Sequence, residues 1–470
     1  MKTFRLFSMA ALALMMGACS EEVNETVEPQ PAPAPGVIEF SGTVTTKDGG
    51  VTRTTMTEQS DGSLNVTWKV DDVIYFFQGG AAVGNASVQT INEDGLATII
   101  GKLEDGDPDK EFDLMYYGGW NAETYLNEAL LYQYGTLDGL GTYDYRVGTA
   151  KIIEDPENAG QYILDGAVTM KSQMAIWKLT LKDGGGNALN VTTKKSLTIK
   201  SDDVDIAVTG GSDYFLGGST NVVYLAMYPV DNKTITVTYN DGTNDYTFSK
   251  AGISLAAGTY YQSEVTLTKV IDLSKLASHY TSLSVTSDVI LTGAPTTDNI
   301  FQIRYDVNNC EVTLDNVNTT AGKYISIDGK GFDGKDKNVN VKLKGTSRLQ
   351  FIVTSKNVTI GEAAAGGTLI LNSPNTYAIY SSETVTINGG TVKAKTTNDN
   401  FATVSADNLV INGGNVYLAG GAVKGAVDVT GDVSDSLYGW NGSSWGYWDA
   451  GASQQYASTD NSANPSTWTW

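Results

Sequence analysis

The chain has 470 residues, enough for about three domains of ordinary size, and 41% of them are hydrophobic, so it can bury a sizeable core. Its formal net charge of −22 argues against nucleic acid as a partner, because nucleic acids bind to basic surfaces. A single histidine and two cysteines exclude metal clusters built from these residues, and they exclude a disulfide framework. The 51 glycines and 25 tyrosines are typical of short β-strands joined by tight turns, so we expect an all-β protein.

Residues 1–18 have the pattern of a lipoprotein signal peptide. Lys2 and Arg5 precede an apolar stretch that is too short to span a bilayer as a mature helix. Small residues then stand directly before Cys19, as in a lipobox. An ordinary secretory signal with an incidental cysteine is the alternative. We expect lipidation of Cys19, whose acyl chains anchor the mature protein to the outer membrane.

An acidic cluster and a proline-rich tether follow the anchor. Ser20-Glu21-Glu22 resembles the surface-export signal of some Gram-negative anaerobes, which implies display on the cell surface. A solvated acidic linker on an inward-facing protein is the alternative. Alternating prolines at 29, 31, 33 and 35 favour an extended polyproline segment. Residues 19–36 are therefore predicted to be the lipidated cysteine and its tether.

From residue 37 onward, short stretches of alternating apolar and polar residues predict β-strands, for example at 37–44, 65–69 and 72–77. Clusters of Asp and Gly between them indicate turns. Only 123–132 has a helical pattern. We expect two β-sandwiches, over 37–170 and 171–270. Trp68 and Trp177 lie in such alternating stretches and are predicted to be core residues.

The start of this region resembles the fimbrillin family of Gram-negative anaerobes. Its members have Thr-Arg-Thr, here around Arg53, and then Trp-x-x-Gly-Asp-x-Ile, which Trp68, Asp72 and Ile74 match. Asp71 stands where the family has glycine.

A second stretch, 222–267, resembles the later half of such proteins: a strand ending in proline, a hairpin, Leu-x-x-Gly-x-x-Tyr and a last strand. The resemblance covers 37–270. It implies two transthyretin-like β-sandwiches of the kind that build fimbriae and cell-surface adhesins.

Arg53 resembles the arginine after which some fimbrial subunits are cut. Such a cut opens a groove for a strand of the next subunit, which is a form of β-augmentation. The alternative is a solvent-facing strand arginine. Polymerising subunits use their own C-terminal strand as the donor, and here a further region follows. We therefore expect an accessory or tip subunit and not a polymerising shaft.

After residue 270 the sequence repeats. Gly-Gly pairs begin at 366, 389 and 413, each beside a short alternating stretch. A fixed period of this length predicts a stacked solenoid, and a parallel β-helix over 275–430 fits best, with a β-sandwich as the alternative. Asn388 and Asn412 occupy equivalent corners and are predicted to form an asparagine ladder, with a sugar contact as the alternative. Cys310 is expected to be buried.

Stretches at 310–316, 327–331, 339–346 and 387–392 resemble a family of β-helical carbohydrate-binding domains. That resemblance implies binding of acidic polysaccharide, often with a divalent metal. The oxygen-rich loop around Asp328, Asp333 and Asp336 is the candidate calcium site. Its lysines oppose a cation, so a solvated turn between coils is the favoured reading and calcium is the alternative. A lyase or hydrolase is the third reading of this region. We expect no enzyme, and no cofactor unless this loop holds calcium.

The tail, 431–470, is rich in tryptophan. Trp440, Trp445, Tyr447 and Trp448 could stack on sugar rings, or the segment could cap the open end of the solenoid or end in a donor-like strand. The sequence as a whole predicts an outer-membrane lipoprotein, lipid-anchored and exposed on the cell surface. It would act as an adhesin or an accessory or tip fimbrial subunit, with fimbrial subunits and a polysaccharide or host glycan as partners. A surface polysaccharide-binding protein without a fimbrial role is the alternative.

Overall fold

The computed structural model describes much of the chain between residues 37 and 447, in the ranges 37–46, 55–191, 196–202, 204–209, 221–277, 279, 281–296, 300–319, 324–398, 401–419, 424–429, 437–440 and 445–447. Of the residues that the structure describes, 60% are in strands and 5% are in helices, which confirms the all-β class. Within these ranges, no helix has the length and apolar character needed to cross a membrane. The predicted signal peptide, Cys19, the tether and Arg53 lie outside the described residues.

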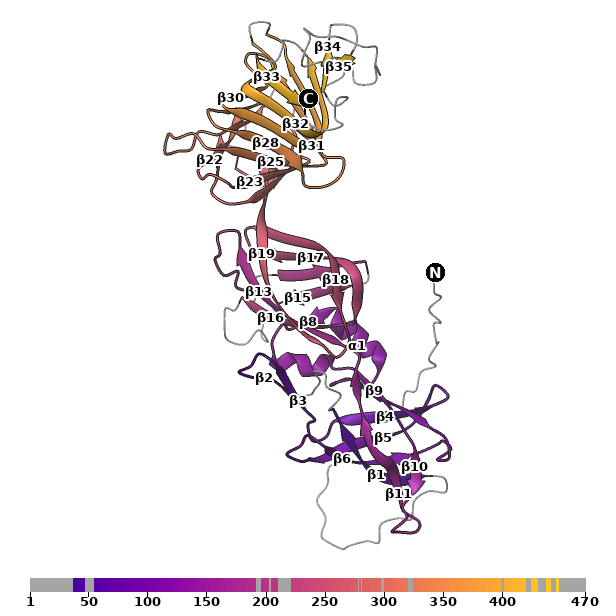
Figure 1. Cartoon of the computed structure of the whole chain (residues 1–470). Coiled ribbons are helices and arrows are strands. Elements are labelled where there is room, and N and C mark those ends of the chain that lie inside the picture. Colours follow the sequence, from indigo (N-terminus) through magenta and orange to yellow (C-terminus); the bar gives the residue numbers. More distant parts are fainter. Residues whose placement is uncertain are drawn as a thin grey trace.

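Three bodies follow one another in a row (Figure 1), and each encloses a hydrophobic cluster of its own. The first body is a nine-stranded sheet in the order β10-β11-β1-β6-β5-β4-β7-β9-β12. Alternation explains its strands: in β6, Ala97, Ile99 and Leu103 are buried, while Thr98 and Lys102 face solvent. The strands of this body, with the small β2–β3 hairpin, are β1 (Ile38–Thr45), β2 (Thr55–Glu58), β3 (Leu64–Thr67), β4 (Val73–Gln78), β5 (Ala81–Ile91), β6 (Ala97–Leu103), β7 (Phe112–Tyr116), β9 (Arg146–Ala150), β10 (Ile152–Glu154), β11 (Tyr162–Thr169) and β12 (Lys171–Ser172).

The residues behind the first family resemblance have clear structural roles. Trp68 is 2% exposed, as predicted for a core residue. Asp72 accepts a hydrogen bond from the backbone N–H of Lys69 at 2.7 Å and one from the Tyr116 hydroxyl at 3.1 Å. Asp71 has a φ of 72°, in the left-handed region that favours glycine, which explains the glycine that the family has there.

A buried ion pair lies beside this turn. The Arg146 and Asp144 side chains are 0% and 2% exposed, and Arg146 Nε lies 2.8 Å from Asp144 Oδ2. Arg146 Nη1 also donates to the carbonyl of Met170 at 3.1 Å, and the guanidinium lies 5.5 Å from the centre of the Trp68 ring. A buried charge of this kind is tolerated only when its partner stays in place.

The second body is a two-layer β-sandwich. One layer is β16-β13-β19 and the other is β15-β14-β17-β18, and both pack on the same core. Trp177 is 4% exposed in that core, as predicted. The strands are β13 (Ala175–Asp183), β14 (Ser196–Lys200), β15 (Asp205–Thr209), β16 (Val222–Met227), β17 (Val230–Asn240), β18 (Asp245–Leu255) and β19 (Tyr260–Asp272).

A segment between β7 and β9 of the first body completes the second body. It holds α1 (Glu123–Leu130), β8 (Tyr132–Gln133) and a 3₁₀ helix (Asp138–Tyr143). Strand β8 pairs in parallel with β15, and the backbone N–H of Tyr224 in β16 donates to the carbonyl of Gly135 at 2.9 Å. Residues 131–135 therefore lie between β15 and β16 of the second body, although in sequence they fall between two strands of the first body.

The side chain of Gln133 bonds to the backbone of β16 in the way that the peptide group of a neighbouring strand would. Its side-chain nitrogen donates to the carbonyl of Ala226 at 2.6 Å, and its side-chain oxygen accepts from the N–H of Ala226 at 2.9 Å. The residue is 1% exposed. Both polar groups of a buried β16 residue are thus satisfied by one side chain.

Glu58, at the end of β2, forms a second tie between the first two bodies. It lies 2.6 Å from Lys178 Nζ and accepts hydrogen bonds from the hydroxyls of Tyr224 at 2.8 Å and Tyr260 at 3.2 Å. All three partners belong to the second body.

The third body consists of coils stacked by parallel pairing. One ladder joins β20, β22, β24, β27, β30 and β32; a second joins β21, β23, β25, β28, β31 and β32; a third joins β26, β29, β31, β32 and β34. The strands are β20 (Ser282–Val285), β21 (Val289–Thr292), β22 (Phe301–Tyr305), β23 (Glu311–Asp315), β24 (Ile325–Asp328), β25 (Val339–Lys344), β26 (Thr346–Leu349), β27 (Phe351–Thr354), β28 (Val358–Glu362), β29 (Thr368–Ser373), β30 (Ile379–Ser381), β31 (Thr384–Thr396), β32 (Val404–Ala419), β33 (Lys424–Val429), β34 (Leu437–Trp440) and β35 (Trp445–Tyr447), with a 3₁₀ helix (Leu273–Lys275) before them.

Details of the coils follow the repeat. Asn412 Nδ2 donates to Asn388 Oδ1 at 2.9 Å, which confirms the predicted ladder contact. Gly390 and Gly414 both have a φ of +81° and lie against the backbone of the preceding coil, so only glycine fits there. Cys310 is 4% exposed, and burial raises the pKa of its thiol to about 11. It is therefore a packing residue and not a reactive thiol.

Candidate functional site

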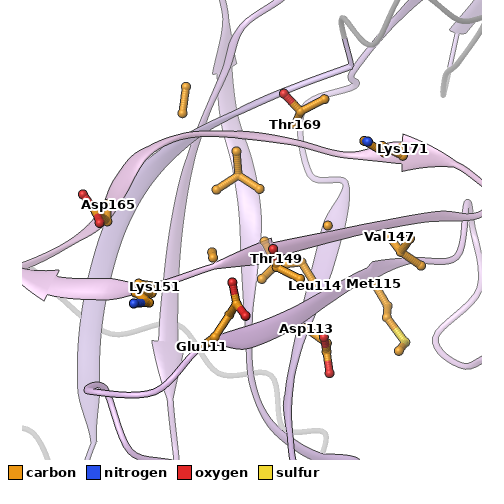
Figure 2. Close-up of a pocket in the computed structure, with 14 residues that line it drawn as sticks. Glu111, Asp113, Leu114, Met115, Val147, Thr149, Lys151, Asp165, Thr169 and Lys171 are labelled. Atoms are coloured by element: carbon orange, nitrogen blue, oxygen red, sulfur yellow. The ribbon is translucent and has the colours of Figure 1, made fainter.

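A groove of about 880 Å³ opens on the first body between β9 and β11 (Figure 2). The chain segments β9–β10 and β11–β12 run antiparallel to each other and pair at both ends, at Val147 with Lys171 and at Ile152 with Leu164. Between these points β11 turns away and pairs in parallel with β1. Among the described strands, residues 148–150 have a ladder partner only in β7. The groove is therefore bordered by an open strand edge.

The groove has an apolar floor and a charged rim. Leu114, Ala150 and Val168 in its lining are buried. Its exposed rim carries both signs of charge, from Glu111, Asp113, Lys151, Asp165 and Lys171 (Figure 2). An extended peptide with alternating apolar and polar side chains matches such a site, because it can pair with the open edge while every second side chain faces the floor.

Strand β1 borders β11 on the opposite edge. It pairs antiparallel with β6 and in parallel with β11, and it buries Phe40 and Val44. This is the strand that a cut after Arg53 would detach from the rest of the chain. Its loss would leave one edge of β6 and one edge of β11 unpaired, so a replacement strand could fill the gap between them. The cut itself stays a prediction, since Arg53 lies outside the described residues.

The three aspartates of the candidate calcium loop do not converge. Asp328 accepts a hydrogen bond from the backbone N–H of Lys330 at 2.8 Å, and Asp333 Oδ2 lies 2.7 Å from Lys337 Nζ. The hydrogen bond from Lys337 lowers the pKa of Asp333. In the described ranges, no group of three or more His, Cys, Asp or Glu side chains is placed to hold a metal ion, and this includes Asp336. Calcium binding by this loop stays a prediction.

The backbone brings two of the four predicted glycan-stacking residues together. Trp440 and Trp445 are register partners in the β34–β35 hairpin, and Tyr447 is opposite Tyr438. Because β34 pairs in parallel with β32, this hairpin continues the coil stack. Trp448 lies outside the described residues. Stacking of sugars by this group stays a prediction.

Sequence reasoning missed a second groove, on the coils. It measures about 300 Å³ and is lined by Phe351, Ile352, Val353, Thr376, Tyr377 and Tyr380. The usable signal in the sequence was an aromatic residue that recurs at nearly the repeat period, at Phe351, Tyr377 and Phe401.

Searches with known proteins give distant similarity only. No model of a known protein family matches the chain, and no curated protein matches it. Among solved structures, a fimbrial protein from Bacteroides ovatus is 14% identical over 50% of this chain and 51% of its own, with a TM-score of 0.26. A fimbrial assembly protein from Parabacteroides distasonis is 13% identical over 49% of this chain and 91% of its own, with a TM-score of 0.25. Scores this low establish neither a shared fold nor a shared function.

Proposed function

We propose that this chain is a lipid-anchored protein of the cell surface that acts as a fimbrillin-like adhesin or as an accessory or tip subunit of a fimbria. In this proposal the two N-terminal sandwiches form a stalk, and the coils of 275–430 are a parallel β-helix carried at its far end. No enzymatic activity is proposed.

Strand β19 is the observation that carries the proposal. Its first part pairs with β13 inside the second sandwich, and its last residues pair in parallel with β21, the first strand of one coil ladder. The sandwich and the coils therefore share one uninterrupted strand. Together with the ties at Gln133 and Glu58, this arrangement favours a stiff support that holds the coils at a distance from the anchor.

The groove between β9 and β11 supplies a contact for a fimbrial partner. A strand of another subunit would pair with the open edge at 148–150 and direct apolar side chains toward Leu114 and Val168. This contact needs no terminal donor strand from the present chain, which agrees with an accessory or tip position.

Mass spectrometry of the protein isolated from cells tests its anchoring and processing. An acylated N-terminus at Cys19 supports the lipoprotein, and a second form that begins at Thr54 supports cutting after Arg53. Arg53→Ala should abolish the second form and leave the first unchanged. A mature chain without acyl groups would contradict the anchor.

Protease treatment of intact cells tests the location, with an internal lipoprotein as the control. We expect this chain to be lost while the control survives. Isolated surface fibres should contain the chain, or cells that lack it should bind less to host or neighbouring cells. A chain that is fully protected from protease would overturn the adhesin proposal.

A second candidate is a surface polysaccharide-binding protein without a fimbrial role. The aromatic groove on the coils favours it, because that site does not depend on any other subunit. Binding of glycans by a chain that is exposed on cells but absent from fibres would select this candidate.

A further inference from the structure

The groove on the coils is formed where the outward side chains of successive coils are aromatic or apolar. In β27, Ile352 and Thr354 are buried, so Phe351 and Val353 point outward. Val353 is the register partner of Tyr380 in β30, one coil further on. The two outward side chains therefore stand side by side on the same ladder.

The tyrosine rings of the groove hold one another in place. The ring centroids of Tyr377 and Tyr380 are 5.3 Å apart with 32° between their planes, and Tyr377 meets Phe401 edge-on at 5.0 Å. All three are half-buried, so each ring keeps an accessible part. The Tyr380 hydroxyl lies 3.1 Å from Ser382 Oγ, at the rim. Rings fixed in this way lose little freedom when a ligand packs on them.

The size of the groove decides between classes of ligand. A volume of about 300 Å³ lies at the lower end of the range for small-molecule sites, which are concave and mostly apolar with a few polar groups. A stable protein interface needs roughly 20–30 residues on each side, and six line this groove. A single ring of a larger polymer fits these limits.

The charges decide between classes of sugar. The six lining residues are uncharged. The charged residues near them in sequence, Lys356 and Glu383, form an ion pair with each other at 2.7 Å. An acidic sugar would find no cation in the lining. An uncharged pyranose presents an apolar C–H face to an aromatic ring and a rim of hydroxyls to groups such as Thr376 and Ser382.

We propose that this groove binds one uncharged pyranose unit of a glycan, stacked on Tyr377 and Tyr380, while the glycan chain crosses the coils over Phe351. The inference rests on the proposed exposure of the coils at the cell surface. It gives the surface protein a ligand class that is set by the groove itself and needs neither metal nor acidic groups on the sugar.

Calorimetry with the full mature chain tests the site. The probes are hexasaccharides of glucose, mannose and xylose, with a galacturonate hexamer as the acidic comparator. We expect an uncharged hexasaccharide to bind and Tyr377→Ala or Tyr380→Ala to weaken it by about tenfold or more. Tyr380→Phe should keep most of the affinity, because the ring remains. Phe332→Ala is the matched control, since it removes a coil aromatic that is 59% exposed and lies outside the groove.

Three results would overturn the proposal: no uncharged hexasaccharide binds, the groove variants bind as the original chain does, or only the galacturonate hexamer binds. Hydrogen exchange of the coils verifies that the variants are folded. The surface-adhesin proposal fails separately. If the purified protein binds glycan in the calorimeter but is protected from protease on cells, the adhesin proposal is refuted and the groove proposal stands. If the protein is exposed on adherent cells but binds no uncharged glycan when purified, only the groove proposal is refuted.

Discussion

The first two bodies and the coils are all made of strands, but they are held together over very different distances along the chain. In the first two bodies, Glu58 bonds to Lys178 and Tyr260 over 120 and 202 residues, and Gln133 bonds to Ala226 over 93. In the coils, Asn388 bonds to Asn412 over 24 residues, which is one coil. The first arrangement couples distant segments. The second limits each contact to neighbours, so its stability is a sum of local interfaces.

The two regions also differ in charge. Residues 37–270 contain 16 Lys and Arg against 31 Asp and Glu, whereas residues 273–430 contain 13 of each. The excess of negative charge on residues 37–270 favours solubility and repels other copies of the chain, and the coils carry no such excess. The uncharged lining of the coil groove agrees with a division between a spacer and a contact region.

The largest effect should come from the buried ion pair of the first body. Arg146→Ala leaves the Asp144 carboxylate buried without its partner. We therefore expect the free energy of unfolding of the first body to fall by about 3–5 kcal/mol. Lys102→Ala, which breaks an exposed pair with Glu104, should cost less than about 1 kcal/mol. Urea unfolding followed by hydrogen exchange measures both. Equal effects of the two variants would contradict the role given to Arg146.

The second largest loss of stability should come from substitution of Gly414 in the coils. In Gly414→Ala the added Cβ would overlap the carbonyl oxygen of Gly390, and the φ of +81° adds strain. We expect the free energy of unfolding of the coils around β32 to fall by about 2–4 kcal/mol, with no effect elsewhere. Gly334→Ala is the matched control, with a φ of +76° and open space around the added atom, and it should cost about 1 kcal/mol. Loss of exchange protection that spreads into the sandwiches would argue against local coupling.

Gln133→Leu tests the opposite behaviour in the sandwiches. It leaves the N–H and C=O of Ala226 without partners, so we expect a loss of about 1–3 kcal/mol and faster exchange in both β8 and β16. Gln173→Leu removes an exposed hydrogen bond to Lys171 and serves as the control. An unchanged exchange rate at Ala226 would show that residues 131–135 are not needed to complete the second sandwich.

Glu58 gives a smaller, pH-dependent effect. The hydrogen bond from Lys178 holds the pKa of Glu58 below its usual 4.5, so the folded protein binds the proton more weakly than the unfolded chain. The tie therefore stabilises the protein above about pH 4.5 and is lost as the pH falls through the lowered value. The Glu58 side chain is 23% exposed, so we expect at most about 1 kcal/mol. Thermal unfolding should show this loss in the original chain and a flatter profile in Glu58→Gln.

The smallest effect should be a gain. Asp71 has a φ of 72°, which a side chain other than glycine adopts at a cost. Asp71→Gly should raise stability by about 0.5–1 kcal/mol without changing the Asp72 hydrogen bonds, as measured by the urea midpoint. A lower midpoint would mean that the Asp71 side chain makes a contact worth more than the strain.

Local patterns were sufficient to predict the all-β class, the core positions of Trp68 and Trp177, and the contact of Asn388 with Asn412. Each depends on alternation or on a short repeat, which the sequence displays directly. The insertion of residues 131–135 could not be predicted, because only Gln133 and Tyr132 form the strand and their partners lie far along the chain. The groove between β9 and β11 could not be predicted either, since it arises where two paired strands separate.

Strand β19 has a mechanical consequence. It pairs with β13 over the run of residue pairs from Ile176–Tyr260 to Asp183–Leu267, all in parallel, and then enters the coils. A pull on the coils along this strand would load those hydrogen bonds together, in shear, whereas the outermost coil can peel away one bond at a time. Under a pulling force the chain should therefore unravel from its outer end first, so that the coils next to β19 stay folded and the joint stays intact.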